Sequence, residues 1–193
     1  YMMDFRGLDS DFIREYCEDV LKAKQHIDKI VEISALFEQF NFDNPPFPLF
    51  VQFETSTACQ ANCLMCPHDQ MQRCGKASWS QIQKIIKEAI PTAQETCPFL
   101  MQEPFLEPRL IAILANIKQN NSQCKTTLYS NMGAAKWEQL KQIVDSDLLD
   151  TLAVSFYAPN RELHEKHQKG VDYDTVIANL QDLRLYRDSQ GKH

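Results

Sequence analysis

The stretch Cys59-Gln60-Ala61-Asn62-Cys63-Leu64-Met65-Cys66 decides how this chain is organised. Its three cysteines stand four and three positions apart, directly after the apolar run Leu49–Glu54. Three thiolates so close in sequence converge on one point where the chain wraps around a shared object, and a cubane iron–sulfur cluster is such an object, because Cys thiolates are its usual ligands. A fourth cysteine is missing from the motif, so one iron would stay open to an outside ligand, as in catalytic metal sites.

Two other uses of the cysteines are weaker. A zinc site takes four Cys or His ligands, and His68 and Cys74 are the side chains near the motif that could complete one. A disulfide framework is typical of short secreted chains, whereas this chain has 193 residues, an odd number of cysteines (seven) and no leader pattern. We therefore expect reduced cysteines and a cytoplasmic protein.

Length and composition indicate an ordinary globular domain. Hydrophobic residues make up 44% of the chain and charged residues 24%, and no apolar run is long enough to span a bilayer. The net charge of −6 argues against a nucleic-acid-binding surface, which needs an excess of Lys and Arg. Because the basic residues are interleaved with acidic ones, we expect no membrane-binding patch either.

The cysteine spacing resembles the signature of radical S-adenosylmethionine (SAM) enzymes. The resemblance implies that Cys59, Cys63 and Cys66 hold a [4Fe–4S] cluster whose open iron chelates the amino and carboxylate groups of SAM. It also implies reductive cleavage of SAM to a 5′-deoxyadenosyl radical that abstracts hydrogen from a substrate. Met65 takes the place of a frequent aromatic residue and is expected to pack against adenine.

A second motif follows the predicted strand Pro98–Met101. Members of the family resemble one another here through a Gly-Gly-Glu-Pro loop, whose carbonyls and glutamate receive the ammonium group of SAM. This chain keeps Glu103 and Pro104 but has Met101 and Gln102 where glycines are usual. A carbonyl needs no particular side chain, whereas close backbone approach to a ligand favours glycine. A family member that no longer binds SAM is therefore an open alternative.

Two further motifs follow the third and fourth predicted strands, 124–129 and 151–156. The turn Ser130–Gly133 resembles the family's Thr-Asn-Gly turn near the cofactor, and Ser155 corresponds to a serine that often contacts it. The resemblance implies that Ser130, Asn131 and Ser155 orient the ribose or the carboxylate of SAM. Turn chemistry alone allows a plain polar turn in which Gly133 supplies a positive φ.

Periodicity predicts alternating strands and helices after an N-terminal pair of helices between residues 9 and 40. Strand 49–54 and the three strands already named alternate with helices 79–90, 108–121, one starting near 137, one near 160 and one around 176–185. Such alternation favours an α/β fold with a parallel sheet. We expect a helical extension over 1–44 and, over 45–193, a partial (βα) TIM-like barrel of the radical SAM type. His164 and His167 are predicted to be surface residues.

The family builds about six strand–helix units, a partial form of the TIM barrel, and this chain supplies four after residue 45, so we expect a C-terminally truncated chain. The residues around Met65–His68 look most like the branch that carries a SPASM or Twitch extension and acts on peptides, sugars and other natural products. The expected partners are a small-molecule or peptide substrate and an electron donor such as flavodoxin or ferredoxin, without nucleic acid or membrane. The alternative is an iron–sulfur electron carrier with Cys74 or Cys97 as a fourth ligand.

Overall fold

A computed structural model describes residues 24, 27–28, 48–67 and 75–192 of the chain. By their contacts the residues fall into two compact units, Tyr1–Pro46 and Phe47–His193, and the second unit contains the cysteine motif. The predicted N-terminal helices lie almost wholly outside the described residues, as do His68 and Cys74.

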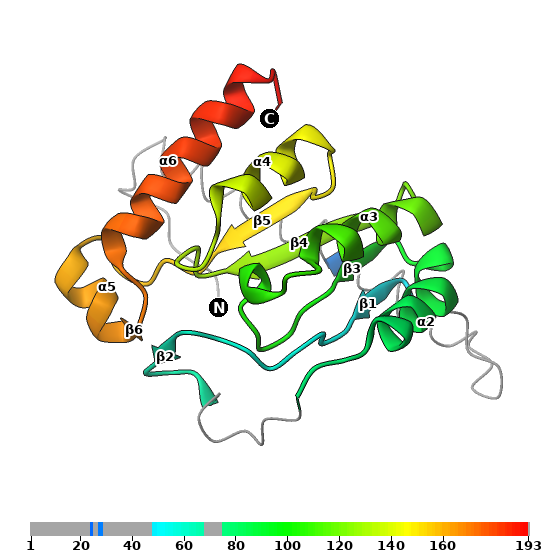
Figure 1. Cartoon of the computed structure of the whole chain (residues 1–193), viewed down its shortest axis with the longest axis horizontal. Coiled ribbons are helices and arrows are strands. Elements are labelled where there is room, and N and C mark those ends of the chain that lie inside the picture. Colours follow the sequence, from blue (N-terminus) through cyan, green and yellow to red (C-terminus); the bar gives the residue numbers. More distant parts are fainter. Residues whose placement is uncertain (1–23, 25–26, 29–47, 68–74, 193) are drawn as a thin grey trace, which may run out of the picture. The chain divides into compact units, whose positions relative to one another are not determined.

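A four-stranded parallel sheet forms the centre of the second unit (Figure 1). Its order is β1-β3-β4-β5, so each strand after β1 is added to the same edge. The strands are β1 (Phe50–Gln52), β3 (Glu95–Cys97), β4 (Lys125–Ser130) and β5 (Thr151–Val154). A separate antiparallel pair joins β2 (Asn62–Cys63) in the cysteine loop to β6 (Gln168–Lys169), about a hundred residues later in the chain.

Helices connect successive strands, as parallel pairing requires. The connecting helices are α2 (Trp79–Ala89), α3 (Leu110–Asn120) and α4 (Trp137–Asp145), with the short 3-10 helices η2 (Ile90–Thr92) and η3 (Pro104–Leu106). Helix α5 (Arg161–His167) lies between β5 and β6, and α6 (Tyr173–Ser189) follows β6. Ser78 and Gln81 form a capping box that starts α2, while the side chains of Asn160 and Asp172 cap α5 and α6.

One face of the sheet is covered by helices. Val51 of β1 packs with Ile82 and Ile86 of α2, and Leu128 of β4 packs in a second cluster with residues of α3 and α4. The alternate residues Phe50 and Tyr129 are 50% and 53% exposed. Because strand residues alternate between faces, the other face of the sheet is open at these positions. This arrangement agrees with an arc of a barrel, and the barrel is not closed within the described residues.

The second strand lies three residues earlier than the sequence predicts. The sequence favours Pro98–Met101, whereas β3 is Glu95–Cys97, paired in register with Phe50–Gln52. Pro98 has no N–H to donate to a neighbouring strand, so the ladder ends before it. Residues 98–103 therefore form a loop at the carboxyl end of the strand.

The predicted surface position of His164 is wrong. His164 is fully buried, with its ring centroid 4.9 Å from that of Phe156 and 5.5 Å from that of Tyr173. Burial lowers the pKa of its imidazole, and neither ring nitrogen has a hydrogen-bond partner among the described residues. His164 is therefore a neutral packing residue of the α5–α6 region.

No helix among the described residues is both long and apolar enough to cross a membrane.

Candidate functional site

The three motif cysteines line one cavity of about 360 Å³ at the carboxyl ends of the parallel strands. In an α/β fold with parallel strands, this end of the sheet is where ligands bind. The other lining residues come from the carboxyl ends of β1 and β4, from the loops after β1, β3, β4 and β5, and from β6: Gln52, Ala61, Phe99, Leu100, Met101, Gln102, Glu103, Tyr129, Ser130, Asn131, Ser155, Tyr157 and Gln168. All the predicted site residues except Met65 are therefore brought together; Met65 is 54% exposed and does not line the cavity.

The motif cysteines are free, partly buried and close enough to influence one another. Burial, followed by the charges of Cys59 and Cys66, raises the pKa of the Cys63 thiol to about 11. Burial also raises the pKa of Cys59, with smaller contributions from Glu103 and Cys66. A group of thiols whose ionisation is opposed by burial and mutual repulsion suits a cationic metal centre, because metal binding removes the protons and neutralises the charge.

Among the described residues, no three Cys, His, Asp or Glu side chains are close enough to hold one metal ion. A single zinc ion needs four ligands around one point, and His68 and Cys74, the side chains that could complete such a set, lie outside the described residues. A cubane cluster is a larger object, because each cysteine binds a different iron. The donor set of three thiols around one cavity therefore fits a cluster.

The cysteine loop is held by a segment that follows α5. Cys63 lies opposite Gln168 in the β2–β6 pair, and the Leu64 N–H donates to the His167 carbonyl at 3.0 Å. Gly170, with φ +86°, lies so close that a Cβ there would be 2.7 Å from the Gln60 carbonyl oxygen. The glycine is required both by its φ and by this close approach. No local pattern in the sequence indicates this long-range support.

Glu103 is the centre of a buried hydrogen-bond network that joins three predicted site residues. Its side chain is 3% exposed, and its carboxylate accepts from the Ser130 hydroxyl at 2.7 Å and the Asn131 N–H at 2.9 Å. The Phe105 N–H also donates to it, at 3.2 Å. Burial raises the pKa of Glu103, while these hydrogen bonds act in the opposite direction. Glu103 forms no ion pair with a described residue, so it is an anion suited to a cationic ligand group.

The loop before Glu103 does not need glycine. Neither Met101 nor Gln102 has a positive φ, so side chains are accommodated without backbone strain. The Gln102 side chain is 5% exposed and is hydrogen-bonded to the hydroxyls of Thr55 and Ser56. The departure from the family's Gly-Gly pair is therefore compatible with a well-formed loop.

The turn after β4 differs from the plain polar turn that its sequence allows. Met132, not Gly133, has the positive φ, 60°. Its N–H is held by the Ser130 hydroxyl at 2.8 Å, and the Gly133 N–H donates to Asn131 Oδ1 at 2.9 Å. A Cβ at Gly133 would lie 2.9 Å from a methyl carbon of Val171. Close packing, rather than backbone conformation, therefore explains this glycine.

Two glutamines of the site were not predicted from the sequence. The Gln60 amide donates to Asn131 Oδ1 at 2.8 Å and so joins the cysteine loop to the β4 turn. The side-chain carbonyl oxygens of Gln60 and Gln168 are buried and have no partner among the described residues. Unpaired buried acceptors are costly, so these two oxygens are available to a bound group with N–H or O–H donors. Gln60 lies inside the cysteine motif, which is the one sequence signal for it.

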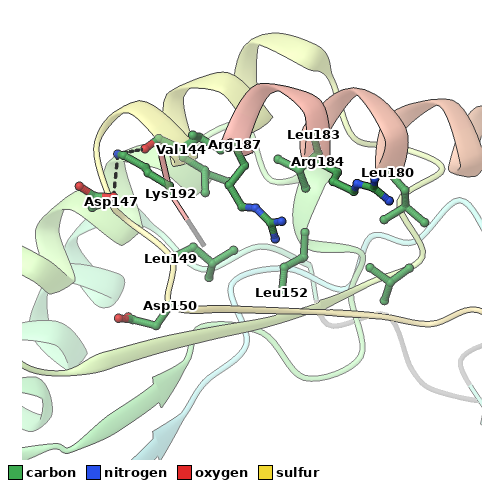
Figure 2. A pocket seen from close by; sticks show the side chains of 12 residues that line it. Val144, Asp147, Leu149, Asp150, Leu152, Leu180, Leu183, Arg184, Arg187 and Lys192 are labelled. Atoms are coloured by element: carbon green, nitrogen blue, oxygen red, sulfur yellow. Dashed lines mark hydrogen bonds and ion pairs between the residues drawn. The ribbon is translucent and has the colours of Figure 1, made fainter. Parts of the chain in front are cut away.

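A second and larger hollow, of about 470 Å³, lies between α4, the β5 segment and α6 (Figure 2). In Figure 2, the side chains of Leu180 and Leu183 of α6 face those of Leu149 and Leu152, and these four leucines make part of the lining apolar. At one end the Lys192 ammonium contacts the Val144 carbonyl and Asp147. No cysteine lines this groove, and none of its lining side chains has an unpaired buried polar atom. The chemistry of the described residues is therefore concentrated in the cysteine cavity.

Similar folds occur among solved structures. The structure of a polyhistidine-tagged anSMEcpe with bound AdoMet superposes with a TM-score of 0.61 and 18% identity, over 72% of this chain and 41% of the other. Streptococcus suis SuiB bound to S-adenosylmethionine gives 0.64 and 18%, over 88% and 37%, and SuiB bound to the precursor peptide SuiA gives 0.64 and 17%, over 96% and 39%. This chain thus spans less than half of the length of each. No curated protein matches the sequence significantly.

The sequence profile of the Radical SAM superfamily matches residues 53–188, a region that begins at the end of the first strand and ends in α6. The cysteine motif and strands β3, β4 and β5 lie within that match, and β1 ends directly before it. A [4Fe–4S] cluster and SAM are the cofactors of the family so identified. The chain belongs to the radical SAM superfamily.

Proposed function

We propose that this protein cleaves SAM reductively at a [4Fe–4S] cluster held by Cys59, Cys63 and Cys66. One observation supports this function above all. The three thiols line the same cavity as the Glu103–Ser130–Asn131 network, so three potential cluster ligands and a buried carboxyl group without an ion-pair partner among the described residues face one space. When bound, the cluster and SAM supply the radical chemistry, and the protein supplies binding and orientation.

The roles of the side chains follow from their donors and acceptors. Glu103 would bind the ammonium group of SAM, because its carboxylate is buried without a cationic side chain. Ser130 and Asn131 hold that carboxylate in place, and Ser155, whose N–H donates to the Ser130 carbonyl at 2.8 Å, lines the same wall for ribose or carboxylate. Met65 would close over adenine from the surface beside Cys66. The buried walls keep bulk water away from the reacting atoms.

The substrate would enter the cavity past exposed apolar and aromatic side chains. Tyr129, Tyr157 and Leu100 line the cavity and are 53%, 48% and 53% exposed. We propose a peptide or small-molecule substrate; the similar SuiB structure was solved with its precursor peptide, and anSMEcpe with the Kp18Cys peptide. Likeness around Met65–Cys66 to the SPASM or Twitch branch supports the same class. An electron donor such as flavodoxin or ferredoxin would reduce the cluster, and the reduced cysteines fit a cytoplasmic protein.

The experiment that tests this function is anaerobic reconstitution with iron and sulfide, reduction with dithionite, and chromatography for 5′-deoxyadenosine after SAM is added. Cys63→Ala should abolish the product and lower the iron content. Cys124→Ala is the matched control, because Cys124 is a fully buried core thiol that does not line the cavity. A loaded cluster that never yields 5′-deoxyadenosine would contradict the proposed reaction and favour an electron carrier.

The carrier alternative needs a fourth cysteine ligand. Cys97 is 1% exposed, packs in the core and does not line the cavity. Its thiol faces the Phe99 carbonyl at 3.6 Å. Its position therefore supports an open iron over ligation by Cys97.

A further inference from the structure

Two segments at the mouth of the cavity are tied together through side chains that no family motif includes. One segment, residues 54–58, leads from β1 into the cysteine loop, and the other, residues 100–103, contains the departure from the Gly-Gly pair. The Glu103 N–H donates to the Ala58 carbonyl at 2.9 Å, which joins the two main chains directly. The side-chain bonds between these segments come from two polar residues, Glu54 and Gln102.

Glu54 binds the backbone of the second segment. Its carboxylate accepts from the Met101 N–H at 2.8 Å and, at longer range, from the N–H groups of Gln102 (3.3 Å) and Leu100 (3.4 Å). Three consecutive N–H groups around one carboxylate fix the direction of the peptide planes between them. Hydrogen bonds to an ionised acceptor are also stronger than those between neutral groups.

Gln102 binds the first segment in return. Its amide oxygen accepts from the Ser56 hydroxyl at 2.6 Å and the Thr55 hydroxyl at 3.0 Å, and its amide nitrogen lies 2.6 Å from the Thr55 oxygen. Gln102 and Thr55 are 5% and 1% exposed, so these bonds are shielded from water. A glycine at position 102 could make none of them.

We propose that Glu54 and Gln102 form a lock that holds the 100–103 loop in position to bind the ammonium group of SAM, in place of the glycine pair. This proposal rests on the proposed function. Where glycines let the backbone approach a ligand through conformational freedom, this chain fixes the same loop through side-chain hydrogen bonds. Both residues are positioning residues, since they act through the loop and through Glu103. The lock also joins the SAM-binding loop to the entry of the cysteine loop.

The lock predicts that restoring the family's usual residue weakens binding. Gln102→Gly removes the amide and adds backbone freedom, so the Kd for SAM should rise about tenfold. The Kd is measured by equilibrium dialysis of labelled SAM against oxidised, cluster-loaded protein, which requires no turnover. Iron content and the EPR spectrum of the reduced cluster without SAM should be the same in the variant and the wild type. The spectral change that SAM causes should require a higher SAM concentration in the variant. Gln123→Gly, in an exposed turn outside the cavity, is the matched control.

A double-mutant cycle with Thr55→Val distinguishes loss of the Gln102–Thr55 interaction from the added backbone freedom of a glycine at position 102. Thr55→Val removes the hydroxyl that Gln102 contacts, so Gln102→Gly should raise the Kd by a clearly smaller factor in the Thr55→Val background. Glu54→Gln should also raise the Kd, with Glu88→Gln on the exposed face of α2 as its control. Unchanged or tighter SAM binding by Gln102→Gly would overturn the lock while leaving the proposed function in place. Loaded wild-type protein that binds no SAM would overturn both.

Discussion

Glu103 and Glu107 flank the same 3-10 helix, η3, and both are almost completely buried, at 3% and 1% exposed. Glu107 is an ion-pair partner: the Arg109 guanidinium donates to it at 2.7 and 2.9 Å, and Lys76 lies at 3.5 Å. Among the described residues, the groups that donate hydrogen bonds to the Glu103 carboxylate are all neutral. The pKa of Glu107 is lowered to about 2 by its bonds to Arg109, against the effect of burial, whereas burial raises the pKa of Glu103.

The difference shows how a buried carboxylate can indicate function. An anion buried with its own cation contributes to the fold, because both charges are compensated within the chain. An anion buried without a cation is destabilising until a cationic ligand arrives, and such groups are concentrated at binding sites. The two residues stand four positions apart in one segment, so their surroundings, not their type, separate the structural role from the proposed functional one.

The largest effect on stability is expected for Glu107→Gln. A pKa lowered from 4.5 to about 2 corresponds to about 3 kcal/mol of folding free energy at neutral pH. Because the folded-state pKa is depressed, this contribution is present above pH 4.5 and is lost as the pH falls towards 2. Urea unfolding of both proteins between about pH 7 and pH 3 measures it. A difference that stays constant across this range would contradict the ion-pair explanation.

Glu103→Gln should give the opposite profile. Because the pKa of Glu103 is raised in the folded state, the wild type loses stability as the pH rises above the pKa of the unfolded state. The free energy of unfolding of the variant, relative to that of the wild type, should therefore increase towards neutral pH. The net change in the free energy of unfolding should stay within about 1 kcal/mol, because two effects oppose each other. The variant avoids burying a charge, but its amide N–H faces the Asn131 N–H and loses that hydrogen bond. SAM affinity of the loaded protein should fall about thirtyfold, or about 2 kcal/mol. Equal SAM affinity would place the ammonium elsewhere.

Asp150→Asn tests a carboxylate that is paired but less buried. Asp150 accepts from Lys118 at 2.6 Å and from the Thr126 N–H at 2.7 Å, which lowers its pKa against the effect of burial, and its side chain is 42% exposed. Solvent screening reduces the contribution to about 1 kcal/mol or less. Thermal unfolding at low and high salt should show a smaller loss than for Glu107→Gln. A loss of stability as large as that of Glu107→Gln would mean that burial does not determine how much an ion pair contributes to stability.

The smallest effect is expected at the surface pair of Arg161 and Asp174. The two charged groups lie 2.5 Å apart, yet their side chains are 58% and 60% exposed. The geometry is as close as that of Glu107 and Arg109, so the pair isolates the influence of burial. Asp174→Asn should leave the unfolding midpoint unchanged within error at physiological salt. A clear loss would weaken the distinction drawn from Glu103 and Glu107.

The sequence predicted those parts of the site that depend on local order along the chain. The cysteine spacing, Glu103, Ser130, Asn131 and Ser155 each follow a strand, and the structure places all of them at one cavity. Helix periodicity likewise located α2 to within one residue. These features can be read from sequence because capping and periodicity act over a few neighbouring residues.

What depends on distant partners could not be read in this way. The bounds of β3 follow from its register with β1, the burial of His164 follows from the rings of Phe156 and Tyr173, and the positive φ of Met132 follows from the turn's packing. A polar residue such as His164 has no local signal that separates a buried position from an exposed one.

By itself, therefore, the sequence predicted which cysteines lie together at the cavity and the order of strands and helices that carries the site. Only the tertiary structure decided that Gln168 lies opposite Cys63 and that Glu54 and Gln102 join two loops. It also decided that Glu107 pairs with Arg109, whereas Glu103 pairs with no cation of the described residues. The physical reason is that charge compensation and hydrogen-bond satisfaction are properties of surroundings assembled from segments far apart in the chain.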